Sequence, residues 1–296
     1  MSHLFWRFIR FQLEVSISNS DFCGAMGQAI MKKVVLILSI LTTAALSLVA
    51  LKPENAYRRV PNSSFGAGEH LEYKVHYGIF NAAEAVVDVA PTLYKVNDRP
   101  CYRVNVYGRT VGAFDLVTRI RNTWRSYIDT TAILPQKFFA HIEEGNHRKE
   151  ENVTFNHFTN TVRADEKTQK DVFKVPENVH DVISGYYYLR TIDFSRVNTN
   201  QTIEVPAFFD DQVYNMKVRY RGREVVKTRF GHINAIKLNP VLPENKLFKG
   251  DDAIRIWVSD DANKVPVKIE VELWVGSMEM DLKKHSGLRN DLKFFK

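Results

Sequence analysis

The sequence predicts a mainly β protein, an antiparallel barrel or half-barrel with one packed helix. Three observations support this fold class. Apolar and polar residues alternate with a period of two over most of the chain after residue 68, as in strands with one dry and one wet face. Turn signals recur between these runs, and one segment alone carries a clear helical period. Many twisted strands joined by short turns curl or close rather than stay flat.

Residues 31–50 have the layout of a secretory signal peptide. Lys32 and Lys33 form a basic head, and an uncharged apolar run follows from Val34 to Ala50. Seventeen residues of helix span about 26 Å, slightly less than a bilayer core of about 30 Å. We expect cleavage after export, with an uncleaved membrane anchor as the alternative. The protein is therefore expected in the periplasm, or otherwise exported across the inner membrane of a bacterium.

The rest of the chain divides by composition. Residues 1–30 show no regular period and are interpreted as an upstream extension outside the mature protein, because Met31 is a suitable start. Residues 51–67 contain Pro53, Pro61 and Gly66 and are interpreted as a tether. Removing residues 1–50 from 296 leaves 246 residues. That length suits a single β domain with a sizeable core, placed at residues 68–296.

Five runs show the strict alternation most clearly, and each is expected to be a strand. They are Leu71–Tyr77, Tyr102–Val106, Val153–Phe155, Tyr214–Tyr220 and Val265–Val275. The last run is expected to form one long strand of about 36 Å, at 3.3 Å per residue. In all, about ten to twelve strands are expected. Short turns and one wet face favour antiparallel pairing.

One segment breaks the period of two. In Asn178–Ile192 the apolar residues recur mostly at spacings of three and four, which predicts an amphipathic helix that caps the open end of the sheet. Asn178 is expected to be its N-cap. Gly185 in its middle costs about 1 kcal/mol relative to Ala, so a close contact is expected there. Ala113–Tyr127 fits both periods, and we expect a short turn followed by a strand.

Charge and cysteine content exclude some functions. The net charge of +7 includes +2 from residues 1–50 and is spread along the chain. Nucleic-acid binding would place Lys and Arg in a stripe, so no nucleic-acid partner is expected. Diffuse positive charge suits ordinary solubility or an anionic envelope surface. Cys101 is the only cysteine after residue 50, so no internal disulfide is expected and the thiol is predicted to be buried and inert.

No pattern specifies a metal, a cofactor or a catalytic group. His141, Glu143 and His147 surround an expected hairpin, where a zinc site is the alternative to a polar surface. Adjacent aspartates at 210–211, 251–252 and 260–261 suit turns better than the alternating ligands of a calcium loop. We therefore predict no metal site, no cofactor and no catalytic residue, although catalysis is not excluded by the sequence.

Aromatic residues supply the candidate ligand-lining set. Tyr186, Tyr187 and Tyr188 span most of a helical turn, so at least one ring must leave the core-facing side. A half-wet tyrosine is the ordinary outcome, and a ring that lines a cavity for an apolar or sugar ligand is the functional alternative. Trp257 and Trp274, from the closing part of the chain, complete the predicted set.

Three segments resemble a family of exported bacterial proteins described as domain of unknown function 3108. They are the opening strand Phe65–Gly78, the helix Asp181–Arg190, and the closing run Ile254–Glu270 with Gly276–Met278. The resemblance covers about residues 65–285 and implies an exported, mostly β protein. It implies no activity and no catalytic residue. The plan is also similar to lipocalin-like barrels and lipoprotein-carrier-like half-barrels, an analogy of fold that does not give function.

The function expected from these features is a non-catalytic periplasmic module that binds an amphiphilic or envelope-derived ligand in its concave face. A lipid or a glycan is the expected ligand, because a curved sheet either fills its interior or encloses something. Two alternatives stay open: an envelope-assembly scaffold that binds protein through a sheet edge, and a carbohydrate-active hydrolase. Membrane contact is expected only through an uncleaved leader. The oligomeric state is not predicted.

Overall fold

A computed structural model describes residues 57–165, 170–241 and 252–296. The predicted leader and upstream extension lie outside these residues. The chain divides into the units Met1–Glu54 and Asn55–Lys296, and the second holds every element described below. Within the described ranges, no helix has the length and apolar character needed to cross a bilayer.

The domain is built from fifteen strands, two α-helices and one short 3-10 helix in the described ranges. The first nine strands are β1 (His70–Tyr77), β2 (Phe80–Val89), β3 (Tyr94–Val96), β4 (Arg99–Thr110), β5 (Arg121–Asp129), β6 (Pro135–Glu144), β7 (His147–Asn156), β8 (Thr161–Asp165) and β9 (Lys170–Lys174). The remaining strands are β10 (Thr202–Phe209), β11 (Gln212–Thr228), β12 (Gly231–Val241), β13 (Ile254–Ser259), β14 (Pro266–Glu272) and β15 (Ser277–Ser286). The helices are α3 (Gly112–Val117), α4 (Val182–Leu189) and η1 (Phe194–Arg196).

All strands belong to one antiparallel sheet that is curved and open. Its order is β10-β11-β12-β13-β14-β15-β1-β2-β4-β5-β6-β7-β8-β9, with β3 paired to β4. Nearly every neighbour is consecutive in sequence, and β15 closes the meander by pairing with β1. The strands β9 and β10 end the path at opposite edges and do not pair. The fold is therefore the half-barrel form of the prediction, and the closed barrel is not formed.

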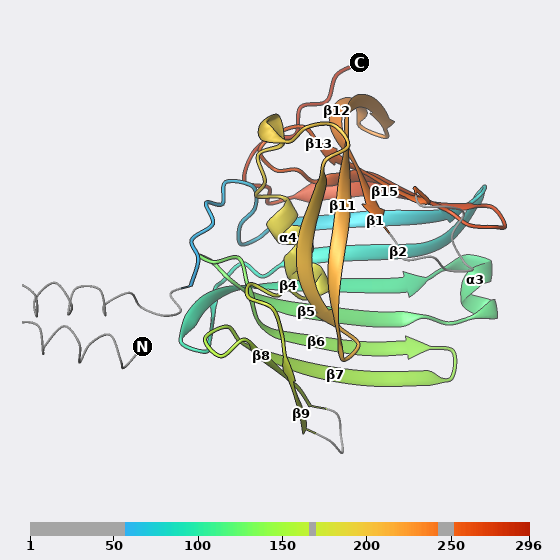
Figure 1. Ribbon diagram of the computed structural model, residues 1–296. Helices are drawn as coiled ribbons and strands as arrows, with labels where there is room; N and C mark the ends of the chain where they lie inside the picture. The colour runs from blue at the N-terminus through green and yellow to red at the C-terminus, as the bar shows by residue number, and fades with distance from the viewer. Residues whose placement is uncertain (1–56, 166–169, 242–251) are drawn as a thin grey trace, which may run out of the picture. The chain divides into compact units, whose positions relative to one another are not determined.

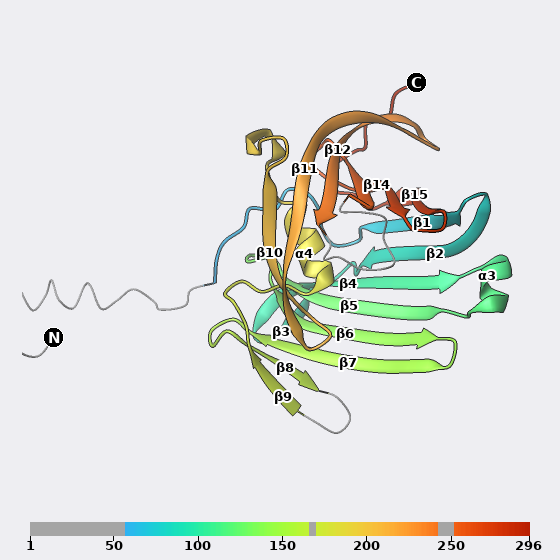
Figure 2. The same cartoon turned by 45° about the vertical axis from the view of Figure 1, so that its right-hand side comes forward.

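The helix α4 explains why the sheet stays open. The chain leaves β9 at one edge, forms α4 and η1, and begins β10 at the other edge. In Figures 1 and 2, β10 and β11 lie across from β4–β7, and α4 lies between them. Contacts of α4 with both β10 and β5 agree with this position. The helix therefore occupies the concave face, where a closed barrel would have its interior.

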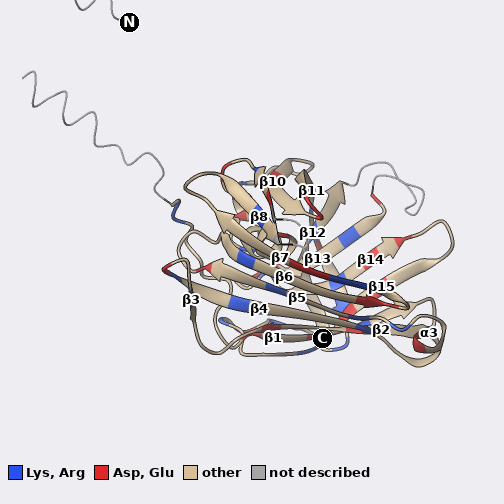
Figure 3. Ribbon diagram, turned by 90° about the horizontal axis from the view of Figure 1, so that it is seen from below, with Lys and Arg blue, Asp and Glu red and all other residues tan. Residues whose placement is uncertain are grey.

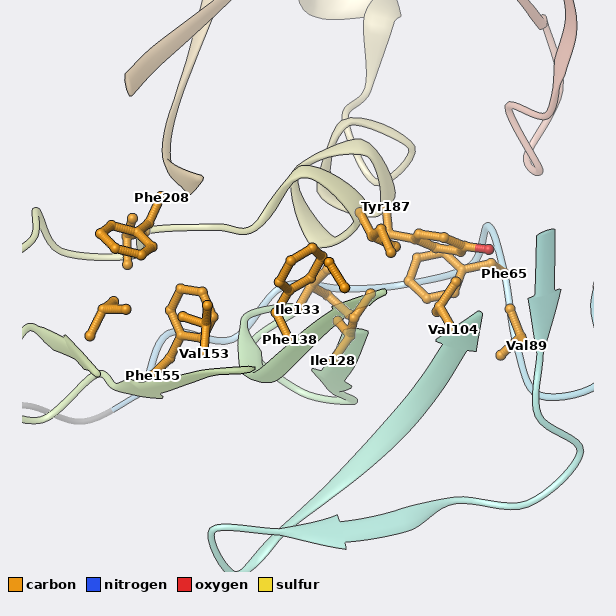
Figure 4. Packing of buried hydrophobic residues seen from close by; sticks show 14 residues of the cluster. Phe65, Val89, Val104, Ile128, Ile133, Phe138, Val153, Phe155, Tyr187 and Phe208 are labelled. Atoms are coloured by element: carbon orange, nitrogen blue, oxygen red, sulfur yellow. The ribbon is translucent and has the colours of Figure 1, made fainter. Parts of the chain in front are cut away.

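The core consists of three apolar clusters on the inside of the curved sheet. Figure 4 shows the largest, in which Phe65, Val104, Phe138 and Tyr187 pack between the sheet and α4. A second cluster joins Leu71 and Tyr73 of β1 to the closing strands and the C-terminal segment, and a third joins η1 to β11–β13. Most of the concave face is thus filled by the protein's own side chains.

Two sequence-based boundaries were wrong. The run Val265–Val275 was expected to be one strand, but β14 ends at Glu272, because residues 273–276 form the turn into β15. Residues 57–67 were expected to belong to the tether, yet Phe65 is fully buried and Val60 bonds the backbone of Thr131. The described part of this segment is therefore packed on the domain. In Ala113–Tyr127 the expected strand is confirmed as β5, whereas the short helix α3 takes the place of the expected turn.

Candidate functional site

A buried carboxylate fixes the first turn of α4. Asp181 accepts hydrogen bonds from the N–H groups of Ile183 and Ser184 at 2.8 and 2.7 Å, and from Ser126 Oγ on β5 at 2.6 Å. The Ser184 hydroxyl accepts the N–H of Asp181 at 3.0 Å, which completes a capping box. The expected N-cap, Asn178, was wrong. It lies three residues too early, with a φ of 56°, whereas Asp181 caps the helix and also bonds β5.

His180 joins α4 to the N-terminal segment. Its Nε2 lies 2.8 Å from Arg58 Nη2, which can only donate, so the ring proton resides on Nδ1, 3.1 Å from Ser184 Oγ. Burial and then the charge of Arg58 lower the pKa of His180 well below its ordinary value. Ser184, His180 and Asp181 are almost completely buried. They therefore form a packed joint rather than a reactive triad.

A buried ion pair fixes the other end of α4. The Arg190 guanidinium donates to both oxygens of Glu69, at 2.5 and 2.7 Å, and also to the backbone carbonyls of Asn263 and Ser64. The Tyr187 hydroxyl donates to Glu69 Oε1 at 3.1 Å. This network ties α4 to the start of β1 and to the β13–β14 turn. Its polar groups are all engaged, which suits a structural role.

The five predicted ligand-lining residues do not line one cavity. Tyr187 is fully buried between Phe65 and Glu69, and Tyr188 stacks on His180 with ring centroids 5.1 Å apart. Trp257 lies in the second core cluster, where its indole N–H bonds Glu224. Trp274 is 65% exposed, in the β14–β15 turn. Of the five, Tyr186 lines a small cavity in the concave face.

That cavity lies between α4 and the inner side of β11–β13, and its volume is about 40 Å³. Its apolar wall is made by five side chains on η1 and β11–β13: Phe194, Val218, Leu238, Ile256 and Val258. The remaining lining residues are Tyr186, Leu189, Arg190 and Lys264. The volume exceeds the roughly 10–15 Å³ needed for one water molecule, and it admits a small group rather than a whole lipid.

Three residues of this lining carry a polar end: Tyr186, Arg190 and Lys264. The Tyr186 hydroxyl is buried and has no hydrogen-bond partner in the part of the chain that the structure describes, although the Arg190 guanidinium lies 5.7 Å from the centroid of the Tyr186 ring. Burial raises the pKa of Tyr186 above its ordinary value. Lys264 has a φ of 49° in the β13–β14 turn, and burial lowers its pKa. The surface inside the cavity is apolar, because these three residues face it with their apolar parts.

Sequence reasoning missed most of this lining. Val218 was assigned to a strand face by its alternation, but its partners on η1 and β13 come from other parts of the chain. Lys264 carried no signal, because it followed the turn sequence Asp260–Asn263 and resembled any polar turn residue. The isolated Phe194 also lay outside the predicted helix.

Of the histidines near the β6–β7 hairpin, His141 pairs with carboxylates. His141 lies 3.2 Å from Glu143 and 3.1 Å from Glu150, and bonding to these carboxylates raises its pKa. His147 lies at the exposed end of β7, and His157 is instead bonded to the carbonyl of Pro135 at 2.7 Å. Across the described ranges, no group of three or more His, Cys, Asp or Glu residues could hold a metal ion.

An open, curved antiparallel sheet wrapped around a short helix defines a β-barrel-like protein. Residues 72–283 match the family described as "Protein of unknown function (DUF3108)". Because the match covers more than half of the chain, the chain belongs to this family. No curated protein sequence matches it.

A solved structure supports the fold assignment. The chain is similar to a β-barrel-like protein of domain of unknown function DUF1849 from Brucella abortus, with 12% identity and a TM-score of 0.50. That match covers 78% of this chain and 99% of the other. A DUF1089 family protein from Pseudomonas aeruginosa matches with 8% identity, a TM-score of 0.37 and coverages of 64% and 89%. At 12% identity, the likeness to the Brucella abortus protein shows the fold alone.

Proposed function

We propose that this chain is an exported, non-catalytic module that binds an amphiphile of the bacterial envelope. The proposed site is the cavity between α4 and β11–β13, with the apolar end of the ligand inside it. The single observation that carries the proposal is an apolar cavity in the concave face whose lining includes Tyr186 and Lys264. An apolar wall with a few polar groups is the usual composition of a ligand site.

Ligand class follows from the lining. Phe194, Val218 and Leu238 offer no hydrogen bonds, so they suit an acyl chain. Lys264 is half-buried at the β13–β14 turn, where an ammonium favours a carboxylate or phosphate headgroup. A longer chain needs more than about 40 Å³, so only the end of an acyl chain would lie inside the cavity and the rest of the ligand would lie outside it. Export of the module is proposed from the leader at residues 31–50, since secretory signals direct proteins out of the cytoplasm.

Native mass spectrometry of the purified full chain tests this proposal. We expect a co-purified lipid mass that is lost in Val218→Trp, which fills the cavity, and weakened in Lys264→Asn, which removes the cation at a left-handed position that asparagine tolerates. Val225→Trp is the matched control, because Val225 lies on the same strand and is exposed. Thermal unfolding of each variant confirms that it folds. A wild-type protein without any adduct, or equal adducts in all variants, contradicts the proposal.

A further inference from the structure

Six large apolar side chains stand exposed at one end of the sheet. They occupy three connections: the β1–β2 turn, α3 between β4 and β5, and the β14–β15 turn. We call them the tip set: Ile79 (90% exposed), Phe80 (61%), Leu116 (91%), Val117 (84%), Trp274 (65%) and Val275 (78%). Exposed apolar groups of this size at one place on a surface usually mark an interaction site.

Contacts between the three connections hold them together. The Tyr77 hydroxyl donates to the carbonyl of Val275 at 2.6 Å, and the Tyr77 ring lies 6.1 Å from that of Phe114 in α3. The N–H of Val111 donates to the carbonyl of Ala82 at 3.0 Å, which joins the start of α3 to β2. Their strands are consecutive in the sheet, and Figure 1 shows these ends side by side at the right. The tip set is thus one surface on a rigid support.

Cationic side chains lie directly behind the tip set. A groove of about 590 Å³ includes Arg109 and Arg121, which flank α3, and a neighbouring groove of about 570 Å³ includes Lys74 and His76, which precede the β1–β2 turn. The two grooves share Lys283. Together their linings contain six Lys or Arg residues and three carboxylates. The excess is therefore three positive charges, although Figure 3 shows both signs spread over the sheet as a whole.

Two cations near the tip set, Lys74 in the second groove and Arg119 outside both grooves, are available to a ligand. Lys74 and the exposed Arg119, which follows α3, form no ion pair among the described residues, whereas Asp115 is already paired with Arg121 at 2.7 Å and Glu84 with Arg109 at 2.7 Å. These ion pairs neutralise Arg109 and Arg121 as well as the two carboxylates, so the available positive charge close to the tips comes from Lys74 and Arg119. Each Lys or Arg close to an anionic membrane contributes about 1 kcal/mol of attraction.

We propose that the tip set docks the domain on an anionic lipid surface. Its side chains project from separate turns and do not form a groove. They therefore suit insertion among lipids better than binding of a protein partner, whose side chains would need a pocket. Tryptophan is typical of the membrane interface, and apolar residues backed by cations are the usual composition of interfacial binding elements. This contact differs from the expectation that only the leader would touch a membrane, and it does not depend on the ligand cavity.

Vesicle co-sedimentation of the full chain tests the proposal. The probe is vesicles of phosphatidylethanolamine mixed with phosphatidylglycerol, and phosphatidylcholine vesicles serve for comparison. We expect the triple variant Ile79→Ser, Leu116→Ser, Trp274→Ser to bind the anionic vesicles at least about tenfold more weakly than wild type. High salt should weaken wild-type binding, because it screens the cations. The emission of Trp274 should shift to the blue on binding, and a Trp274→Phe variant should lose that shift.

The matched control is the triple variant Leu93→Ser, Val172→Ser, Val213→Ser. These residues are also exposed and apolar but lie away from the three tip connections. All variants keep residues 1–56, so any lipid binding by the leader is common to them. Equal binding of the two triple variants overturns the proposal. So does equal binding of wild type to neutral and anionic vesicles. Lipid-independent self-association that the tip variant abolishes also overturns it, in favour of a dimer interface.

Discussion

Arg190 and Glu69 form an ion pair with almost no exposure of either side chain. Removing water from two charges is costly, and their mutual attraction offsets this cost only when the remaining hydrogen bonds are satisfied. Here the guanidinium also bonds two backbone carbonyls, and its centre lies 5.0 Å from the centroid of the Tyr187 ring. The pair therefore fixes the geometry of α4 against β1, and losing one member leaves the other charge buried alone.

We predict that Glu69→Gln lowers the free energy of unfolding by about 3–5 kcal/mol, because Arg190 then lacks its counter-charge. Urea unfolding followed by circular dichroism measures this loss. Asp98→Asn is the control, since its ion pair with Lys95 lies on the surface and exposed pairs contribute little. A loss no larger than that of the control would show that Arg190 finds compensation elsewhere.

Asp181 supplies a prediction about pH. Burial raises its pKa from 3.8 to about 6, so the folded state binds a proton more tightly than the unfolded state. Its contribution to stability is therefore complete below about pH 4 and is lost as the pH rises through 6. Asn at 181 caps a helix equally well but does not titrate.

We therefore expect the unfolding free energy of wild type, minus that of Asp181→Asn, to fall by about 2.5 kcal/mol between pH 4 and pH 7, most of the total from a shift of about two pKa units at 1.36 kcal/mol per unit. Denaturant unfolding across this range measures the difference. The pH-dependent contributions of all other titratable groups are the same in the two proteins and cancel in this difference. The low pKa of His180, for example, destabilises both on acidification below its ordinary pKa of 6.5. A difference that does not change with pH would mean that the pKa of Asp181 is the same in the folded and unfolded states.

At the scale of elements, α4 is short but closely packed. A Cβ atom at Gly185 would lie 2.8 Å from the terminal methyl of Met216, 3.6 Å from His180 Cβ and 3.7 Å from Val205 Cγ1. The first atom is the flexible end of a side chain and can move, whereas the other two belong to the joint before α4 and to β10. The close contact predicted from Gly185 is thus confirmed.

Gly185→Ala should change the free energy of unfolding by no more than about 1 kcal/mol, because the gain in helix propensity offsets the shift of Met216. Gly185→Val should lose about 1–3 kcal/mol through overpacking against His180 and Val205. Thermal unfolding compares both variants with Gly66→Ala, which should be neutral because a Cβ atom added at Gly66 would have no neighbour within 4 Å. Equal stability of the Val and Ala variants would mean that α4 can shift away from β10.

The free edges of the sheet bear on the scaffold alternative. The edge strand β9 has five residues and begins and ends with lysine, and short, charged edges discourage pairing with another chain. At the other edge, β10 is partly covered, because the N–H of Phe208 donates to the carbonyl of His180 at 2.8 Å. The two edge strands therefore offer few unpaired backbone groups to which a partner protein could add a strand.

At the scale of the whole molecule, the alternating pattern was sufficient to predict an antiparallel, curved β domain with one packed helix. It did not decide between open and closed forms, because that depends on whether β9 meets β10, a contact between short strands with α4 between them. The strand at Val265–Val275 was overestimated because Val275 continues the alternation into a turn. Val275 is exposed there and belongs to the tip set rather than to the core.

Site prediction from sequence was weaker than fold prediction for a physical reason. The lining of the cavity comes from α4, η1 and three strands that meet only through the curvature of the sheet. A run of three tyrosines shows that one ring must leave the core, but not which one. Tyr186 lines the cavity, whereas Tyr187 and Tyr188 contact Glu69 and His180.

Because the tip set lies at the ends of strands, it determines how a membrane-bound domain is oriented. Tyr57 and Val60 contact residues beyond the other end of β5, near Gln136 and Thr131, and the nine residues of β5 extend over about 30 Å. If the tip set touches the bilayer, β5 points away from it, and the place where residues 57–60 join the domain lies about 30 Å from the lipid headgroups.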